Sequence, residues 1–136
     1  MITLRPATAS DRDILFMWRQ EYDPVTEAEH NAWLAKWIET MSLCSYEGLF
    51  IAEIDGVAIG TGRITMVITG GRSPAAVHYY IVPSLRQNGH GTELVKRLTE
   101  KAKWMGYREV VARIKRENRA SLHCALMGGV TAVTFL

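Results

Sequence analysis

Residues 82–92 read Val-Pro-Ser-Leu-Arg-Gln-Asn-Gly-His-Gly-Thr, and the rest of the chain can be understood from this stretch outward. The apolar run from Ala75 to Val82 leads into it, and its β-branched and aromatic residues are typical of a strand. After Gly91, apolar residues recur at three- and four-residue steps, which is the spacing of one helix face. They are Leu94, Leu98, Ala102 and Met105. The stretch is therefore predicted to join a strand to the start of a helix.

The same stretch has the composition of an anion-binding turn. Gly89 and Gly91 lack a Cβ, so the backbone can take unusual conformations and an anion can approach it closely. The first amides of a helix have no partner inside the helix, and a pyrophosphate suits them. No Lys follows Gly91 and Leu94 stands where a third glycine would be, which excludes two better-known phosphate loops. An ordinary glycine-containing turn is the alternative.

The overall composition is that of one folded domain, expected to span residues 1–136. Apolar residues make up 48% of the chain and charged residues 22%, which argues against disorder and for a soluble protein. There are 16 basic and 14 acidic residues, and the net charge of +2 gives no reason to expect a nucleic-acid partner. This charge is compatible with the binding of small anionic ligands.

Cysteine usage and the ends of the sequence point to an intracellular, cytoplasmic protein. Cys44 and Cys124 match no metal-binding spacing, so we expect no metal and two reduced thiols in or near the core. The charged residues between Met1 and Asp13 argue against a signal peptide. The apolar run from Cys124 to Leu136 is shorter than the roughly 20 residues that a membrane span needs, so no membrane partner is expected.

Read in order, the chain alternates strand and helix signals. A capping box, Thr26-x-x-Glu29, opens a helix, and Asp55-Gly56 is a strong hairpin signal. We predict strands at 2–5, 48–54, 57–69, 75–82, 109–114 and 130–136, and helices from Thr8 or Ser10 to 22, from 26, from the glycine loop to 106, and from 118 to 128. The order βααβββαβαβ implies an α/β (α+β) fold with a mixed central sheet, because a crossover helix makes a parallel pair and hairpins make antiparallel ones.

Two helices are predicted to have an apolar face, and core packing is predicted for that of the second. The first helix presents Ile14, Leu15, Met17 and Trp18. The second presents Trp33, Leu34, Trp37, Ile38 and Met41, for which a substrate surface is the alternative.

The motif Arg86-x-x-Gly89-x-Gly91, after a strand that ends in Val-Pro, resembles the acetyl-CoA loop of the GNAT N-acetyltransferases, [Arg/Gln]-x-x-Gly-x-[Gly/Ala]. The predicted element order is also that of the family, over nearly the whole chain. Further matches resemble the branch that acetylates ribosomal-protein N-termini and amino-sugar nucleotides. They are Leu4-Arg5-Pro6-Ala7-Thr8 with Asp11, Trp18-Arg19, Glu29-His30-x-x-Trp33-Leu34, Asn118-x-x-Ser121 and Gly129.

The chain departs from the family pattern at three places. Ala125 stands where many members have a tyrosine that protonates the departing thiolate, and Val130 replaces the usual phenylalanine. After Gly129 there is room for one terminal strand where the family usually has two, so we expect an open sheet edge or pairing with a second protomer as a homodimer.

The resemblance implies a GNAT-like sheet with helices on both faces and acetyl-CoA as co-substrate. It implies that the pantetheine arm pairs with the backbone of Ile81 and Val82, and that the side chain of Asn118 also meets this arm. The side chain of Arg86 would add a charge-assisted bond. The pyrophosphate would lie on the N–H groups of Gln87, Asn88, Gly89, His90, Gly91 and Thr92.

Proton transfer has four candidate side chains: His78, Tyr79, Tyr80 and His123. Strand alternation places His78 and Tyr80 on one face of the sheet and Tyr79 on the other. Tyr79 and His123 are the residues that we select as catalytic, and a chain of water molecules is the alternative to a dedicated base. His90 is expected to be a turn residue, and His30 to belong to a helix turn near the acceptor side.

Two functional hypotheses follow. The first is an acetyl-CoA-dependent N-acetyltransferase in which a primary amine attacks directly in a ternary complex. The acceptor is either a small-molecule amine or a protein N-terminus. The second is a non-catalytic acyl-CoA-binding or regulatory module, which Ala125 and the single terminal strand favour.

Overall fold

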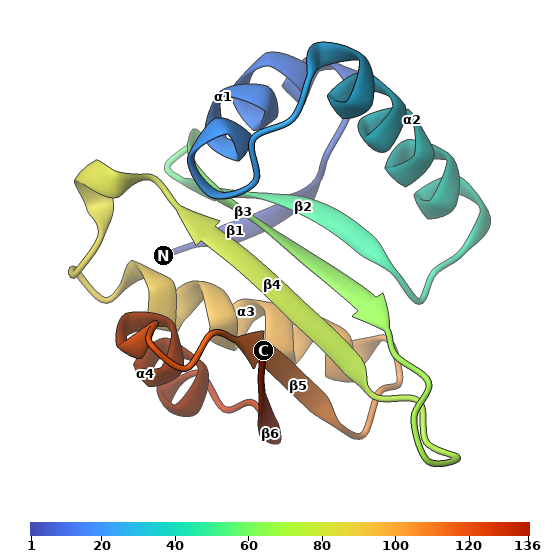
Figure 1. The fold of residues 1–136 in the computed structure, drawn as a ribbon, viewed down its shortest axis with the longest axis vertical. Coiled ribbons are helices and arrows are strands. Elements are labelled where there is room, and N and C mark those ends of the chain that lie inside the picture. Colours follow the sequence, from blue (N-terminus) through green and yellow to red (C-terminus); the bar gives the residue numbers. More distant parts are fainter.

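The computed structural model describes residues 1–136, and its elements follow the predicted order (Figure 1). The strands are β1 (Thr3–Pro6), β2 (Gly48–Ile54), β3 (Val57–Met66), β4 (Ala75–Ile81), β5 (Val110–Ile114) and β6 (Ala132–Phe135). The helices are α1 (Arg12–Tyr22), α2 (Glu27–Leu43), α3 (His90–Trp104) and α4 (Arg119–Met127), with short 3₁₀ turns η1 (Ala9–Asp11) and η2 (Pro83–Leu85). None of the helices has the length and apolar character needed to cross a lipid bilayer.

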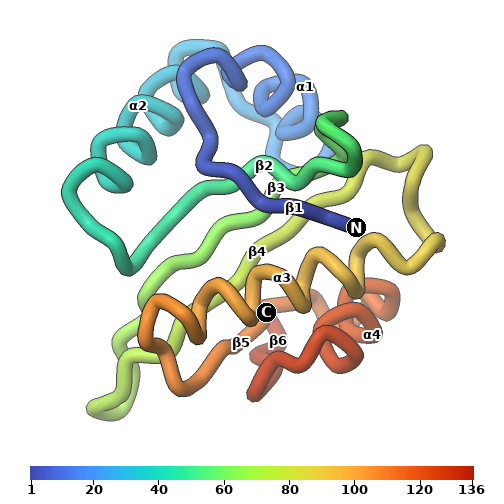
Figure 2. Tube along the Cα trace, turned by 180° about the vertical axis from the view of Figure 1, so that it is seen from behind, coloured from blue at the N-terminus to red at the C-terminus, as the bar shows by residue number.

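The six strands form one mixed sheet in the order β1-β2-β3-β4-β5-β6. Neighbours from β1 to β4 are antiparallel, whereas β4–β5 and β5–β6 are parallel, because helices α3 and α4 make the crossovers. Helices α1 and α2 cover one face of the sheet and α3 and α4 cover the other (Figures 1 and 2). The predicted fold class is confirmed.

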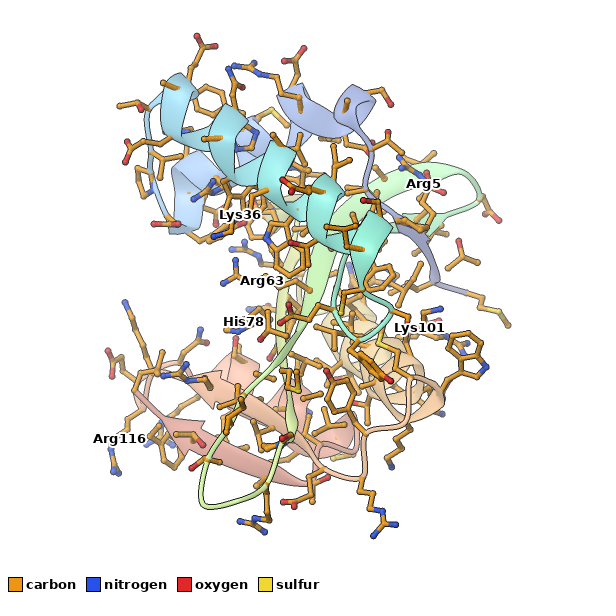
Figure 3. All side chains as sticks on the ribbon, turned by 90° about the vertical axis from the view of Figure 1, so that its right-hand side faces the viewer. Arg5, Lys36, Arg63, His78, Lys101 and Arg116 are labelled. Carbon is orange, nitrogen blue, oxygen red and sulfur yellow. The ribbon has the colours of Figure 1, made fainter.

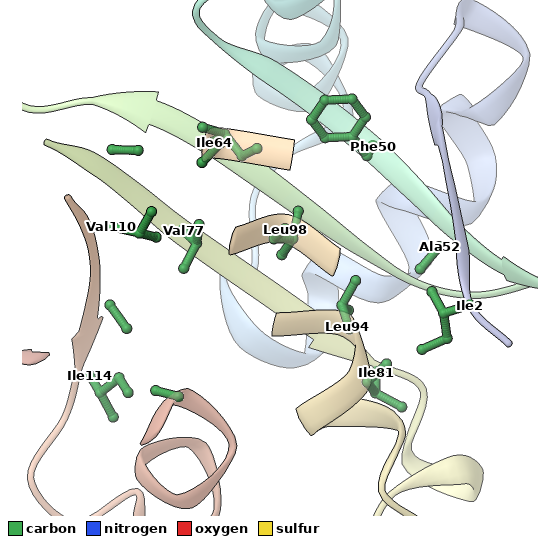
Figure 4. Close-up of a cluster of buried hydrophobic side chains, with 14 of the residues drawn as sticks. Ile2, Phe50, Ala52, Ile64, Val77, Ile81, Leu94, Leu98, Val110 and Ile114 are labelled. Atoms are coloured by element: carbon green, nitrogen blue, oxygen red, sulfur yellow. The ribbon is translucent and has the colours of Figure 1, made fainter. Parts of the chain in front are cut away.

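Each face of the sheet has its own apolar core. The larger core joins β2–β5 to α3, and its residues Leu94, Leu98 and Ala102 are fully buried, as the helical spacing predicted (Figure 4). The smaller core packs Leu15, Trp18 and Leu34 of α1 and α2 against the other face. Met17, which belongs to the apolar face predicted for the first helix, has a side chain that is 62% exposed. The prediction of core packing for the second helix is confirmed for Leu34 and, in part, for its half-buried neighbours.

Local sequence signals explain the ends of several elements. Thr26 Oγ1 accepts from Glu29 N at 3.2 Å and Glu29 Oε1 accepts from Thr26 N at 3.0 Å, which is the predicted capping box. Asp55 and Gly56 take φ values of +50° and +79°, as a two-residue hairpin turn requires. Strand β3 ends at Met66 rather than at residue 69, because the chain beyond it closes a second tight turn.

Two polar networks hold the layer of α1 and α2. The Arg5 guanidinium donates to both Asp11 carboxylate oxygens at 2.8 and 2.9 Å, so the opening Leu-Arg-Pro motif has a structural role. His30 is fully buried, and its Nε2 donates to the Arg12 carbonyl at 2.9 Å while its Nδ1 accepts from Arg19 at 3.4 Å. A carbonyl only accepts and a guanidinium only donates, so His30 is a neutral structural link between the two helices.

Candidate active site

The sheet opens between β4 and β5. These two parallel strands pair only at Ala75↔Val110, Ala76↔Val111 and Val77↔Ala112, and beyond that point they diverge. A cavity of about 470 Å³ begins where the pairing stops. It is lined by Glu21, Tyr22, Trp33, Leu49, Thr61, Gly62, Arg63, Val77, His78, Tyr79, Tyr80, Arg113, Ile114, Lys115, Asn118, Ser121 and Leu136.

Side chains from both faces of β4 line this one cavity. Tyr80 packs among the α1–α2 core, whereas the Tyr79 hydroxyl donates to the Ser121 carbonyl of α4 at 2.7 Å. The predicted alternation of His78 and Tyr80 against Tyr79 is therefore confirmed. Residues on opposite faces of a strand can share a cavity only where the neighbouring strand has moved away. The cavity thus connects the α1–α2 side of the sheet with the α4 side.

The backbone of β4 has open hydrogen-bonding groups at the cavity. Val82 N donates to Ile59 O of β3 at 2.9 Å, and Ala75 N donates to Glu109 O on the β5 side at 2.9 Å. By alternation, the backbone groups of Tyr79 and Ile81 face the side that β5 has left. Val82 was predicted to pair with a pantetheine arm, but its N–H is already bonded to the Ile59 carbonyl within the sheet. An extended ligand could pair with the backbone groups of Tyr79 and with the N–H of Ile81, whose carbonyl already accepts from Arg86 Nε.

The glycine loop leads directly into α3, as predicted. Gln87 and Gly89 take φ values of +65° and +81°, which lie in the left-handed region of backbone conformation. Glycine enters this region without strain. Gly89 is the N-cap of α3, and no side chain caps this helix end. The first helical bond runs from Glu93 N to Gly89 O at 3.1 Å, which leaves the amides at 90–92 without a helical partner. The loop therefore has the donors and the positive helix end that a pyrophosphate requires.

Gly91 is needed for close packing rather than for a special backbone conformation. A Cβ at this position would lie 2.8 Å from the Cys124 Sγ of α4. Cys124 and Cys44 are half-buried free thiols, as predicted. The absence of a side chain at Gly91 therefore lets α4 pack directly beneath the start of α3.

The side chain of Arg86 lies against β4 and α1. Its Nε donates to the Ile81 carbonyl at 2.9 Å, and its Nη2 lies 2.8 Å from Glu21 Oε1. The guanidinium also lies 5.2 Å from the centre of the Tyr80 ring. Glu21 accepts a further hydrogen bond from the Tyr80 hydroxyl, and this bond with the Arg86 pair lowers the pKa of Glu21. No local sequence signal marks Glu21, because its role depends on how α1 crosses the sheet.

Burial and nearby positive charge set the protonation state of the cavity. Burial, together with the charges of Arg63 and Arg113, lowers the pKa of His78 to about 4, so this imidazole is neutral at neutral pH. Burial also raises the pKa of Tyr79 to about 12, which keeps its hydroxyl protonated. The structure thus places a neutral base and a protonated hydroxyl in one cavity.

The remaining predicted residues divide between the cavity and the surface. Asn118 lines the cavity, and its Oδ1 caps α4 by accepting from Ser121 N at 3.1 Å. His123 is exposed on α4 and is not among the cavity residues. Sequence reasoning did not select Arg63 or Tyr22 for the site, and it gave Trp33 a place at a substrate surface only as the alternative to core packing. No three His, Cys, Asp or Glu side chains lie close enough together to hold a metal ion.

Comparison with known proteins gives one family match and many fold matches. A family model described as an acetyltransferase (GNAT) domain matches residues 1–131. Among curated proteins, no sequence is significantly similar to this chain.

Solved structures share the fold. The structure of AAC(6')-Iy with the bisubstrate analogue CoA-S-monomethyl-acetylneamine has a TM-score of 0.77 at 20% identity, with 96% of this chain and 90% of that one covered. An N-acetyltransferase from Staphylococcus aureus Mu50 has a TM-score of 0.75 at 23% identity, with coverages of 93% and 81%. The Salmonella typhimurium protein yncA, solved with its cofactor acetyl-CoA, has a TM-score of 0.71 at 22% identity, with coverages of 94% and 78%.

Proposed function

This chain belongs to the GNAT family of acetyltransferases, and on that premise we propose that it transfers an acetyl group from acetyl-CoA to a primary amine by direct attack in a ternary complex. The observation that carries this proposal is the cavity between the diverged strands β4 and β5, which opens toward both layers of helices. A thioester approaching from the α4 side and an amine approaching from the α1–α2 side can meet there. Holding both reactants in one cavity supplies much of the rate of such a reaction.

The residues around the cavity fit acetyl-CoA. The uncapped amides of His90, Gly91 and Thr92, with the loop amides at 87–89, would hold the pyrophosphate. The backbone groups of Tyr79 and the N–H of Ile81 would pair with the pantetheine arm, and Asn118 would meet it from the start of α4. When bound there, acetyl-CoA supplies the acetyl group as an activated thioester. Arg86 is already held by Glu21, so it orders the loop and the β4 carbonyl before any ligand binds.

Two side chains support proton handling in the cavity. Tyr79 is a protonated hydroxyl donor at the α4 side. It is our candidate acid that protonates the leaving thiolate, a role that Ala125, fully buried in the core, cannot fill. His78 lies on the amine side as a neutral imidazole and can accept a hydrogen bond from the amine. His123 has no role in the proposed mechanism, because its side chain is exposed outside the cavity.

Release of free CoA thiol, measured with acetyl-CoA and a panel of primary amines, tests the proposal. We expect saturable, amine-dependent thiol release by the wild-type protein. Tyr79→Phe should lower kcat by about 100- to 10,000-fold, as loss of an acid does, and leave acetyl-CoA affinity within about threefold. Tyr107→Phe is a matched control, because the Tyr107 hydroxyl donates to the Tyr46 carbonyl away from the cavity. A Tyr79→Phe protein with unchanged kcat would remove Tyr79 from the mechanism.

A second candidate function is a non-catalytic acyl-CoA-binding or regulatory module. The buried Ala125 favours it, because no hydroxyl can reach the cavity from that position. Stoichiometric acetyl-CoA binding without thiol release on any amine would support the module over the enzyme.

A further inference from the structure

The cavity carries an excess of positive charge. Arg63, Arg113 and Lys115 line it, and Glu21 is the one carboxylate side chain among its lining residues. Glu21 is already bonded to the Arg86 guanidinium and the Tyr80 hydroxyl. Three cationic side chains therefore outnumber the acidic side chains of the cavity, and such an excess attracts and orients anions.

Arg63 differs from the other arginines that are withdrawn from solvent. Arg5, Arg12, Arg19, Arg63 and Arg97 are buried or half-buried. Apart from Arg63, each has a carboxylate oxygen between 2.7 and 3.3 Å away. The Arg63 side chain has neither an ion pair nor a hydrogen bond. Burial lowers the pKa of its guanidinium more than Tyr22 and Asp23 raise it, and the group is still a cation at neutral pH. A half-buried cation without a partner is costly unless a ligand supplies the opposite charge.

The position of Arg63 fits a ligand that also reaches the reaction site. Arg63 of β3 pairs directly with His78 of β4, so both side chains are on the same face. Figure 3 shows both projecting toward the space between the α1–α2 layer and strands β5 and β6. Neighbouring strands are about 4.8 Å apart, so the opening beyond β4 lies roughly two strand spacings from β3. A short molecule can span this distance.

We propose that the acceptor carries an anionic group in addition to its amine, a carboxylate or a phosphate, and that the Arg63 guanidinium binds this group. The planar, forked guanidinium can donate two parallel hydrogen bonds to either anion. Arg113 and Lys115 are exposed at the rim of the cavity and attract the anion toward Arg63. The substrate class is thus a small acidic amine. This inference rests on the proposed function, because it concerns the acceptor side of the same cavity.

Matched acceptors test the proposal by steady-state thiol release. Each amino acid is compared with its carboxamide and with the aminophosphonate of equal chain length. We expect the wild-type protein to prefer the anionic amine over its carboxamide by about 10- to 100-fold in kcat/KM, as loss of a charged hydrogen-bond pair implies. Arg63→Gln should bring this ratio close to one, because kcat/KM should fall more for the anionic amine than for the carboxamide, and Arg63→Lys should keep part of it. The acceptor with the higher kcat/KM, the carboxylate or the phosphonate, identifies the anion that the site prefers.

The control variant is Arg108→Gln, since Arg108 is exposed and does not line this cavity. It should keep the full preference, and acetyl-CoA affinity measured by calorimetry should be unchanged in both Gln variants. Equal kcat/KM for acidic and neutral amines in the wild-type protein, or a preference that survives Arg63→Gln, would overturn the proposal.

A binding measurement separates this proposal from the proposed function. N-acetylated amino acids carry the anion but no reactive amine, so their binding to the CoA-loaded protein does not depend on turnover. If no amine is acetylated but these compounds bind and Arg63→Gln abolishes the binding, the anion site stands and the enzymatic function fails. If amines are acetylated but these compounds bind no better than their carboxamides, the anion site is refuted.

Discussion

Substituting Gly91 tests how the candidate acetyl-CoA loop is built. A Cβ at this position would lie 2.8 Å from Cys124 Sγ, whereas carbon and sulfur need at least about 3.5 Å. The thiol or the start of α3 must therefore move by roughly 0.7 Å in Gly91→Ala, and overpacking of this kind costs about 1–3 kcal/mol. Alanine is the better helix former by up to about 1 kcal/mol, which offsets part of that cost. We expect a net loss in unfolding free energy of about 1–2 kcal/mol.

The sign of this effect should reverse when Cys124 is also changed. In Cys124→Ala the nearest remaining side-chain atom, the Cβ of residue 124, is 3.9 Å from the added methyl group, which is an ordinary contact. Gly91→Ala should then be neutral or stabilising by up to about 1 kcal/mol, which gives a coupling energy of roughly 1–3 kcal/mol. Acetyl-CoA affinity should fall in Gly91→Ala and return in the double variant, because the helix end returns to its place.

Urea unfolding of the four proteins measures the coupling, with calorimetry of acetyl-CoA binding in parallel. Gly89→Ala is the matched control: an added Cβ meets nothing within 4 Å there, but its φ of +81° costs an alanine about 1–2 kcal/mol. That cost should be the same in the wild-type protein and in the Cys124→Ala variant. An equal cost of Gly91→Ala in both backgrounds would refute the packing explanation.

Three further predictions concern single residues. In the wild-type protein the unfolding free energy should fall by about 1–2 kcal/mol between about pH 8 and 5, because the folded pKa of His78, about 4, is below the unfolded value of 6.5 and the unfolded chain binds more protons as pH falls. His78→Gln should abolish this loss. Urea unfolding at the two pH values would contradict the prediction if it showed no difference between the two proteins. His30→Leu should lower stability by roughly 3 kcal/mol, because it removes two buried hydrogen bonds, and a thermal transition within a degree of wild type would contradict this. Asn118→Ala should cost about 1 kcal/mol through loss of the α4 cap and also weaken acetyl-CoA binding, whereas Asn118→Ser should restore the stability alone; calorimetry beside urea unfolding separates the two effects.

The elements could be predicted from the sequence because their signals are local. The capping box at Thr26, the left-handed turn at Asp55 and Gly56, and the spacing of Leu94 and Leu98 each depend on a few neighbouring residues. The glycine loop can be located for the same reason, since a glycine-containing turn before a helix is visible in the chain itself. The exposed side chain of Met17 could not be predicted, because only the packing of α1 decides which edge of its apolar face meets solvent.

The acceptor side of the cavity could not be predicted from sequence, because it joins residues that are distant in the chain. Arg63 and Glu21 are ordinary charged residues until β3 and α1 place them around one opening. The titration range of a histidine favours His123, but the turn of α4 directs its side chain to the surface. The strand register determines the direction of the Val82 N–H, which points toward β3 and was therefore not open to a ligand as expected.

The most direct test of the account is the ¹H–¹⁵N correlation spectrum of the labelled protein during addition of acetyl-CoA. If the pyrophosphate lies on the α3 end and the pantetheine arm lies beside β4, the largest shifts should be those of the Tyr79 and Ile81 amides and of the amides at 87–92. The hairpin amides of Gly56 and Gly70 should stay in place. Unchanged amides at 87–92, or shifts gathered elsewhere on the protein, would contradict the claim that this loop and the open strand pair hold acetyl-CoA.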